Sequence, residues 1–227
     1  MPDSSRNTQE INNVYWLRQN KRNDIPLDCI PAYRALLNSL IGHYKKIIDQ
    51  IIVEGGGKLS FPMETTLLEN YLEGFSFEYH PLPIWLESEQ KDIEGFSEYS
   101  LVNPDKVVIY YNASAPSCRQ RFTKIHELFH FIQSLDVKFL NFFDELILNS
   151  TLPPDVVNKI MERGTDKAVA MYLMPNNYFL KKYDEIRKEI GVRKMKYAVL
   201  QELARYFDVS KQTARFRLGE CGILVPS

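Results

Sequence analysis

The segment Arg121–Ile132 constrains the fold of this chain more than any other part of its sequence. His126 and His130 stand four residues apart, Glu127 follows the first of them, and most of the remaining residues are apolar. On an α-helix, a spacing of four places both imidazoles on one face, where they converge beside the helix axis. The apolar residues require the same helix to pack into a core. The segment therefore predicts a buried helix that presents two histidines to a common partner.

A divalent metal ion is the partner that this pattern favours. Zn²⁺ accepts neutral imidazole at about 2.0–2.1 Å, and a helix supplies two such ligands without strain. Glu127 is too far round the helix to share the metal easily, but it is near enough to hold a water molecule, as the general base of an HExxH hydrolase does. We therefore predict that His126 and His130 bind zinc and that Glu127 is catalytic. The alternative is a pair of histidines that core contacts satisfy without a metal.

A catalytic zinc site needs a third protein ligand and leaves its fourth position to water. Glu162 lies on the next long predicted helix, which becomes apolar toward its end and must pack on the core. A carboxylate on the inner face of such a helix is costly to bury unless it is paired or binds a metal. Asp144, Glu145 and Asp166 compete with Glu162, and spacing alone leaves all four open.

Apolar periodicity predicts one long amphipathic helix from Pro31 to Val53, which three glycines then end. The residues before it are polar and predict at most a short helix at residues 14–17. Strands are expected at residues 75–80, 95–99 and 106–111, and further helices at 62–72, 117–135, 153–175, 177–190, 197–207 and 211–220. Because strands precede most of the helices, we expect an α+β protein.

Composition is that of an ordinary globular protein, because 44% of the residues are apolar, 25% are charged and the net charge is −1. A membrane span needs about 20 consecutive apolar residues, and runs such as Ile47–Val53 are far shorter. The N-terminus is polar and lacks the apolar core of a signal peptide. We therefore expect a cytoplasmic protein without membrane contact. Its three widely spaced cysteines predict reduced thiols, with neither disulfides nor a CxxC zinc site.

The C-terminal part of the chain is basic, since residues 181–227 carry 11 basic and 6 acidic side chains, whereas residues 1–180 carry 17 and 23. Within it, Leu203–Leu218 has the pattern of a helix, a tight turn and a second helix that Ser210 caps. In a helix-turn-helix, DNA would face the polar residues Lys211, Gln212, Arg215 and Arg217. The alternative, which we favour, is that the helix pair packs on the rest of the protein, with its positive charge facing the acidic part.

The stretch from Val107 to Pro175 resembles the ImmA/IrrE family of metallopeptidases. The shared pattern is a strand that ends in asparagine (Ile109–Asn112), Arg-Phe-Thr before the histidine motif, and a helix that runs from a glutamate to Leu-Met-Pro. When the helices are aligned on Pro175, Glu162 falls on the family's glutamate. The resemblance, which covers roughly residues 60–225, implies that Glu162 is the third zinc ligand and that the core is zincin-like.

Two departures from the family pattern concern the site. Phe129 stands where the family usually has glycine, which is expected to narrow the cleft above the metal. Thr165 and Asp166 replace an Ala-Asn pair, and Gly164 precedes them where a helix-forming residue is usual. Asp166 could accept a hydrogen bond from a ligand imidazole and so orient it.

The resemblance also implies how a substrate binds. In a zincin-like core, an edge strand lies across the cleft and binds substrate by strand addition, and Lys106–Tyr111 is expected to be that strand. The reaction further needs a group that stabilises the oxyanion. Four side chains are chemically able to do so, and we leave them open: His80, Tyr110, Tyr111 and Tyr172.

The resulting expectation is an intracellular zinc metallo-endopeptidase with a regulatory role. By resemblance, its partner is a protein substrate such as a helix-turn-helix transcriptional repressor. The alternative is a DNA-binding or sensor regulator in which the peptidase fold is not catalytic. We divide the chain into a helical N-terminal extension (residues 1–58), a zincin-like core (59–180) and a helix-turn-helix-like segment packed on the core (181–227). The extension could serve dimerisation, substrate choice or the core itself.

Overall fold

A computed structural model of the chain describes residues 25–82, 94–99, 103–136, 141, 152–190 and 195–223. The short helix expected at residues 14–17 lies outside the described residues, as do the candidate ligands Asp144 and Glu145. None of the helices in the described ranges is long and apolar enough to cross a membrane. All three cysteines are free thiols, as their spacing predicts.

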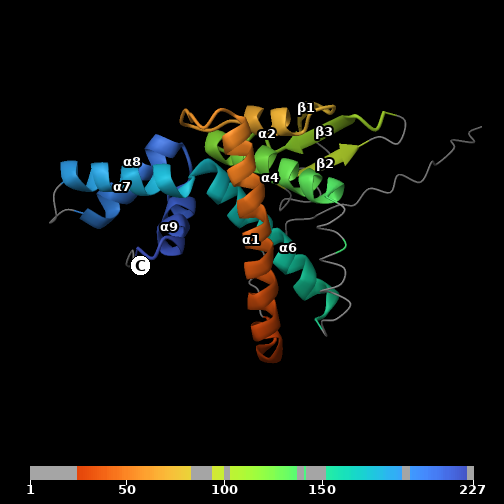
Figure 1. Cartoon of the computed structure of the whole chain (residues 1–227), viewed down its shortest axis with the longest axis horizontal. Helices are drawn as coiled ribbons and strands as arrows, with labels where there is room; N and C mark the ends of the chain where they lie inside the picture. The colour runs from red at the N-terminus through yellow and green to blue at the C-terminus, as the bar shows by residue number, and fades with distance from the viewer. Residues whose placement is uncertain are drawn as a thin grey trace, which may run out of the picture.

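The α+β class is confirmed, because helices predominate and three strands form one small mixed sheet (Figure 1). The elements are η1 (Leu27–Cys29), α1 (Ile30–Glu54), α2 (Thr66–Tyr71), β1 (Ser76–Pro81), β2 (Gly95–Tyr99), β3 (Lys106–Tyr111), α4 (Ser117–Leu135), α6 (Pro154–Leu173), α7 (Asn176–Ile190), α8 (Met195–Phe207) and α9 (Lys211–Glu220). Most bounds agree with the sequence patterns within two residues. The exception is α2, which starts four residues later than predicted.

The long helix α1 forms where the apolar periodicity predicts it. Pro31 lies in its first turn, where the missing N–H costs no helical hydrogen bond. The apolar stripe is buried along one side of the helix. The helix ends because Gly56 and Gly57 adopt φ values of 84° and 68°, in the left-handed region that glycine enters without a steric penalty.

The sheet has the strand order β1-β3-β2, with β1 parallel and β2 antiparallel to β3. The expectation that β3 is an edge strand is therefore wrong: β3 pairs on both sides, and β2 lies at one edge. Val107 and Ile109 are fully buried, and the dense apolar run of β3 is what a central strand requires. The edge strand instead carries the more polar sequence Gly-Phe-Ser-Glu-Tyr.

Helix α4 packs on one face of this sheet. Side chains alternate between the two faces of a strand, so Phe77, Ile109 and Ser97 share the face toward α4, where Phe77 meets Phe131 at a ring distance of 5.9 Å. Gly95 makes the close approach to α4 sterically possible. A Cβ atom at this residue would lie 2.3 Å from Thr123 Cγ2.

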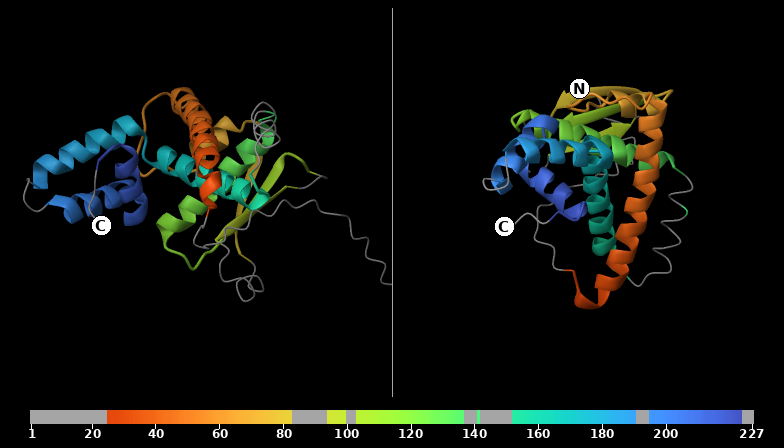
Figure 2. Two further views of the ribbon diagram at one scale, coloured as in Figure 1. Left: turned by 90° about the horizontal axis from the view of Figure 1, so that it is seen from below. Right: turned by 60° about the vertical axis from the view of Figure 1, so that its left-hand side comes forward.

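Helices α1 and α6 run side by side in the views of Figures 1 and 2, and their contact is close. Gly164 on α6 explains this, because a Cβ atom there would lie only 2.2 Å from Leu40 Cδ2 on α1. The departure from the family pattern at this position is therefore a packing requirement of α1. The division of the chain near residues 58 and 180 stays a prediction.

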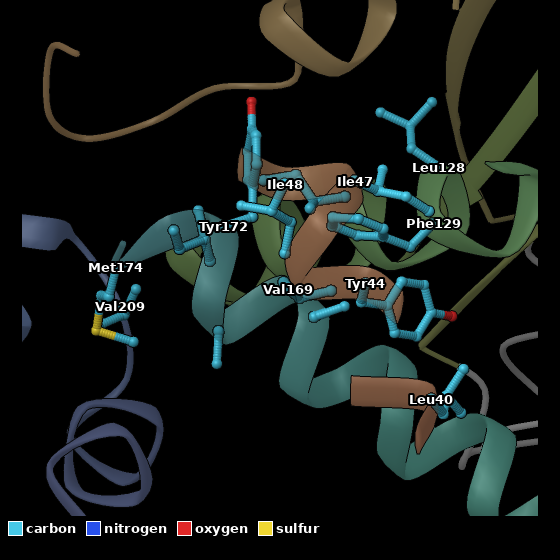
Figure 3. Close-up of a cluster of buried hydrophobic side chains, with 14 of the residues drawn as sticks. Leu40, Tyr44, Ile47, Ile48, Leu128, Phe129, Val169, Tyr172, Met174 and Val209 are labelled. Atoms are coloured by element: carbon cyan, nitrogen blue, oxygen red, sulfur yellow. The ribbon is translucent and has the colours of Figure 1, made fainter. Parts of the chain in front are cut away.

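A cluster of aromatic rings joins α1, α4 and α6 in the core (Figure 3). The ring of Phe129 meets the edge of Tyr44 at a centroid distance of 5.5 Å and that of Tyr172 at 6.0 Å. Phe129 is fully buried. The expectation that Phe129 narrows a cleft above the metal is therefore wrong: its side chain fills the core between these rings.

The C-terminal helices gather at one end of the molecule (Figure 1). Two buried arginines, Arg121 and Arg217, attach them to the rest. Arg121, on α4, donates to Asp208 Oδ2 at 2.9 Å, to the Asp208 carbonyl and to the Phe207 carbonyl at 3.2 Å. Arg217, on α9, donates to the Met174 carbonyl at 3.1 Å and to Asn176 Oδ1. Arg217 is therefore not one of the cations that could face DNA.

The α8–α9 pair has the local geometry that its sequence predicts. Ser210 caps α9, because its hydroxyl accepts a hydrogen bond of 3.0 Å from the Thr213 N–H. The charge argument for its docking is wrong, however. Among the described residues, the ion pairs that join residues 181–227 to the rest place the anion on the C-terminal side: Arg121 with Asp208, and Lys167 with Glu220 at 3.2 Å. Specific buried contacts, rather than net charge, hold the pair.

Candidate metal centre

Three side chains from two helices converge at one point. His126 and His130 come from α4 with their Nε2 atoms 2.9 Å apart. Glu162 reaches them from α6, with Oε2 at 3.4 Å from His126 Nε2 and Oε1 at 3.2 Å from His130 Nε2. One donor atom from each of the three residues lies within 4.8 Å of the others. The packing of α6 against α4 thus favours Glu162 over Asp166, the other acidic candidate that the structure describes.

The chemistry of this donor set fits a metal ion. Both histidines are buried, and both Glu162 oxygens are buried without accepting a hydrogen bond in the described part of the chain. Buried carboxylate oxygens are costly to leave in that state. A divalent cation bound by two imidazoles and one carboxylate would satisfy all three groups and leave one position open. Such ligands suit zinc but discriminate poorly against other divalent ions.

Electrostatics favour positive charge at this point. Burial by itself would lower the pKa of His126, but Asp166 and Glu162 outweigh burial and raise it to about 10. Burial would raise the pKa of Glu162, but the two imidazoles hold it well below its ordinary value. The carboxylates therefore stabilise a cation here, whether a proton or a metal ion carries the charge.

Each histidine has a polar partner behind its ring. Asp166 Oδ1 lies 3.2 Å from His126 Nδ1, at ion-pair distance, and the orienting role expected for this residue stays a prediction. Gln133 Oε1 lies 3.0 Å from His130 Nδ1. Gln133 is not among the residues predicted from the sequence, although a polar residue three positions after His130 on an apolar helix is a signal for such a partner.

Glu127 lies outside the ligand cluster but close to it. Its side chain is buried, and burial raises the pKa of its carboxyl, while His126 and His130 act in the opposite direction. Ser97 on β2 donates a hydrogen bond of 3.1 Å to Glu127 Oε2. Nothing in the sequence pattern singled out Ser97, because a serine in an edge strand is unremarkable until the sheet is assembled.

The four residues proposed as oxyanion donors make contacts elsewhere. His80 and Tyr110 point to the sheet face opposite α4, where their rings lie 6.0 Å apart. The Tyr111 ring lies 3.9 Å from Lys124 Nζ. Tyr172 is buried and donates to the Glu64 carbonyl at 2.7 Å. None of these contacts is with the three clustered side chains, and the choice of an oxyanion donor stays open.

A hollow of about 1230 Å³ lies between α4, α6 and α9. Asp166 and Phe122 are among its lining residues, but the three clustered side chains and Glu127 are not. The hollow therefore lies next to the metal centre, on the side of Asp166, and does not contain the metal centre itself.

Comparison with known proteins supports one family. Residues 78–219 match the Peptidase M78 family, described as an IrrE N-terminal-like domain, and this range holds all three clustered side chains and Glu127. None of the curated protein sequences matches. Among solved structures, the chain is similar to a Mycobacterium tuberculosis transcriptional regulator, with 12% identity and a TM-score of 0.52, covering 83% of this chain and 51% of the other.

That structural similarity, at low identity, concerns the fold alone, and this chain spans about half the length of the regulator. The family match is stronger, because it includes more than half of this chain and agrees with the resemblance that the sequence motifs indicate. On this evidence, the chain belongs to the Peptidase M78 family of IrrE N-terminal-like domains.

Proposed function

We propose that this protein is a zinc-dependent endopeptidase in which His126, His130 and Glu162 bind the metal and Glu127 is the general base. The observation that carries the proposal is the geometry of Glu127. It is a buried carboxylate next to the cluster of three donors, yet it is not one of them. A site that only stored a metal would have no need of it.

The bound metal would act as a Lewis acid that polarises the scissile carbonyl and lowers the pKa of a water molecule. Glu127 accepts the proton of that water and passes it to the leaving amine. Ser97 holds the carboxylate of Glu127 in place by its hydrogen bond. Burial keeps competing water away from the carboxylate and strengthens this interaction.

The substrate is an extended protein segment that adds to β2. The strand order supports this proposal, because β2 pairs with β3 alone in the described part of the sheet and substrate strands add at such an edge. The hydrogen bond from Ser97 to Glu127 supports this proposal, because it joins β2 to the proposed base. The resemblance to the ImmA/IrrE family favours a helix-turn-helix repressor as the substrate.

We further propose that α8 and α9 have a structural role rather than that of a DNA reader. The buried anchors Arg121 and Arg217 support this, since both hold the helix pair to the core. Lys211, Gln212 and Arg215 remain exposed on α9. They are the residues that a DNA-binding regulator would use.

The test compares wild type with Glu127→Gln, which keeps the shape of the side chain and removes the base. Zinc content by elemental analysis and cleavage of a repressor encoded near the same gene are measured on the same samples. We expect about one zinc per chain in both proteins and a loss of cleavage of at least about 10²-fold in the variant. Near wild-type cleavage by Glu127→Gln would refute the mechanism. A zinc-loaded wild type that binds DNA specifically and cleaves nothing would favour the regulator.

A further inference from the structure

We propose that Tyr44, on α1, is a positioning residue of the metal centre, which acts through Gln133 to hold His130 in the tautomer that offers Nε2 to the metal. This inference rests on the proposed metal site. It assigns a role to α1, which precedes the residues that match the family.

Four hydrogen bonds connect the backbone of α6 to the ring of His130. Thr165 donates to the Met161 carbonyl at 3.0 Å, and its oxygen lies 2.9 Å from the Tyr44 hydroxyl. The Gln133 amide nitrogen donates to the Tyr44 hydroxyl. Gln133 Oε1 then lies 3.0 Å from His130 Nδ1.

The donor and acceptor in each of these four hydrogen bonds follow from the Met161 carbonyl, at which the series begins. A backbone carbonyl can only accept, so the Thr165 hydroxyl proton points to Met161. Thr165 must then accept from Tyr44, which leaves the Tyr44 oxygen to accept from the Gln133 amide nitrogen. The amide group has one donating and one accepting end, so its oxygen faces His130.

The accepting end of Gln133 determines the state of His130. An amide oxygen beside Nδ1 requires a proton on Nδ1, and a neutral imidazole with that proton has its lone pair on Nε2. Nε2 is the atom that faces His126 and Glu162. If the amide were reversed, its N–H would face Nδ1, the proton would move to Nε2, and the ring could not bind the metal.

Burial lets these four hydrogen bonds control the orientation of the Gln133 amide. Tyr44 and Thr165 have no exposed surface, and Gln133 and His130 are also buried. Water therefore has little access to replace a missing partner. Burial also raises the pKa of the Tyr44 hydroxyl, which keeps it neutral and able to donate to Thr165.

The packing of α1 explains why Tyr44 is in range. Leu40, one turn earlier, fits against Gly164, and the Tyr44 ring makes a T-shaped contact with the ring of Phe129, the residue before His130. In Figure 3, the Tyr44 ring lies beside Phe129, between α1 and α4. Through Tyr44, helix α1 would then be a part of the core that supports the metal centre.

The test is Tyr44→Phe, which keeps the ring and removes only the hydroxyl. The matched control is Tyr33→Phe, because Tyr33 is buried on the same helix but accepts its hydrogen bond from Arg163, which belongs neither to the ligand set nor to the hydrogen bonds that lead to His130. Zinc affinity is measured by competition with a chelator, and the melting temperature of the metal-free proteins is measured alongside. We expect Tyr44→Phe to bind zinc about tenfold more weakly, which is the low end of the effect of removing a hydrogen-bond partner behind a metal ligand. The loss should be no larger, because Thr165 Oγ1 still lies 3.4 Å from the Gln133 nitrogen and can accept from it.

A second comparison separates orientation from packing. In a Gln133→Glu background, the residue at position 133 is a carboxylate, and both of its oxygens accept hydrogen bonds. It therefore has no orientation that turns an N–H toward His130, and Tyr44→Phe should no longer weaken zinc binding. Nitrogen-15 NMR of the histidine rings should show the Nδ1–H tautomer of His130 in metal-free wild type and a larger Nε2–H fraction in Tyr44→Phe.

The outcomes distinguish this inference from the proposed function. Equal zinc affinity in wild type and Tyr44→Phe, or an equal loss in both backgrounds, would overturn the role of Tyr44 and leave the metal site intact. A wild type that binds no zinc would overturn both.

Discussion

Ser97 on the edge strand β2 donates a hydrogen bond of 3.1 Å to the buried carboxylate of Glu127 on α4. The contact joins the strand proposed to bind substrate to the group proposed to move the proton. It also explains why a polar side chain faces inward on this strand, since Ser97 shares the sheet face that packs on α4.

The first prediction concerns this contact. Ser97→Ala should lower cleavage by about tenfold or more, because a hydrogen bond to a charged group is worth about 1.5–3 kcal/mol and Glu127 is then held less firmly. Zinc content should not change, since Ser97 does not touch the ligands. Ser97→Thr is the control that keeps the hydroxyl and should retain most of the activity. If alanine at this position cleaves as fast as serine, the strand does not position the base.

A second prediction concerns the metal and stability. A ligand that binds only the folded state stabilises it by about 2.7 kcal/mol at a concentration 100 times its Kd. Adding zinc to metal-free wild type should therefore raise its melting temperature by several degrees. Glu162→Gln should lose most of this increase, because an amide is a poor replacement for a carboxylate ligand. Calorimetry of both proteins with and without zinc measures the effect, and an equal response in the two would remove Glu162 from the ligand set.

A third prediction concerns the contact between α1 and α6. Gly164→Ala would place a Cβ atom 2.2 Å from Leu40 Cδ2, so it should lower the free energy of unfolding by about 1–3 kcal/mol through overpacking. Gly42→Ala is the matched control, because that Cβ would have no heavy atom within 4 Å. On a helix, alanine in place of glycine should stabilise by about 0.5–1 kcal/mol. Denaturant unfolding of both variants checks the contrast, and a stable Gly164→Ala protein would show that α1 does not pack as described.

A fourth prediction separates the two arginines of α9. Arg217→Ala should lower the free energy of unfolding by about 2 kcal/mol or more, since it removes buried hydrogen bonds of a charged group to the Met174 carbonyl and Asn176. Arg215→Ala, at an exposed residue, should leave stability within about 0.5 kcal/mol. A gel-shift assay of Arg215→Ala completes the experiment. Salt-dependent DNA binding that is lost in this variant would contradict a purely structural role for α9.

Much of the secondary structure was predictable, because periodicity is a property of short windows of sequence. The apolar stripe of α1, the bounds of β2 and β3, and the capping of α9 by Ser210 all follow from neighbouring residues. The pairing of β3 was not predictable in the same way. A strand's own residues do not state which strands flank it, and the expected edge strand lies at the centre of the sheet.

The residues of the candidate site also fall into two groups, those that local sequence predicts and those that only tertiary packing brings together. The sequence by itself determined that His126, Glu127 and His130 share a buried helix, because a spacing of one and four residues acts within a single helix. Spacing left four acidic residues open and only the family resemblance pointed to Glu162, and it is the packing of α6 on α4 that brings this residue to the histidines. Tyr44 and Gln133 lie 89 residues apart and meet only when α1 packs on the core. A tyrosine in an apolar stripe looks the same in sequence whether or not its hydroxyl has a buried partner, and that partner is decided by tertiary structure.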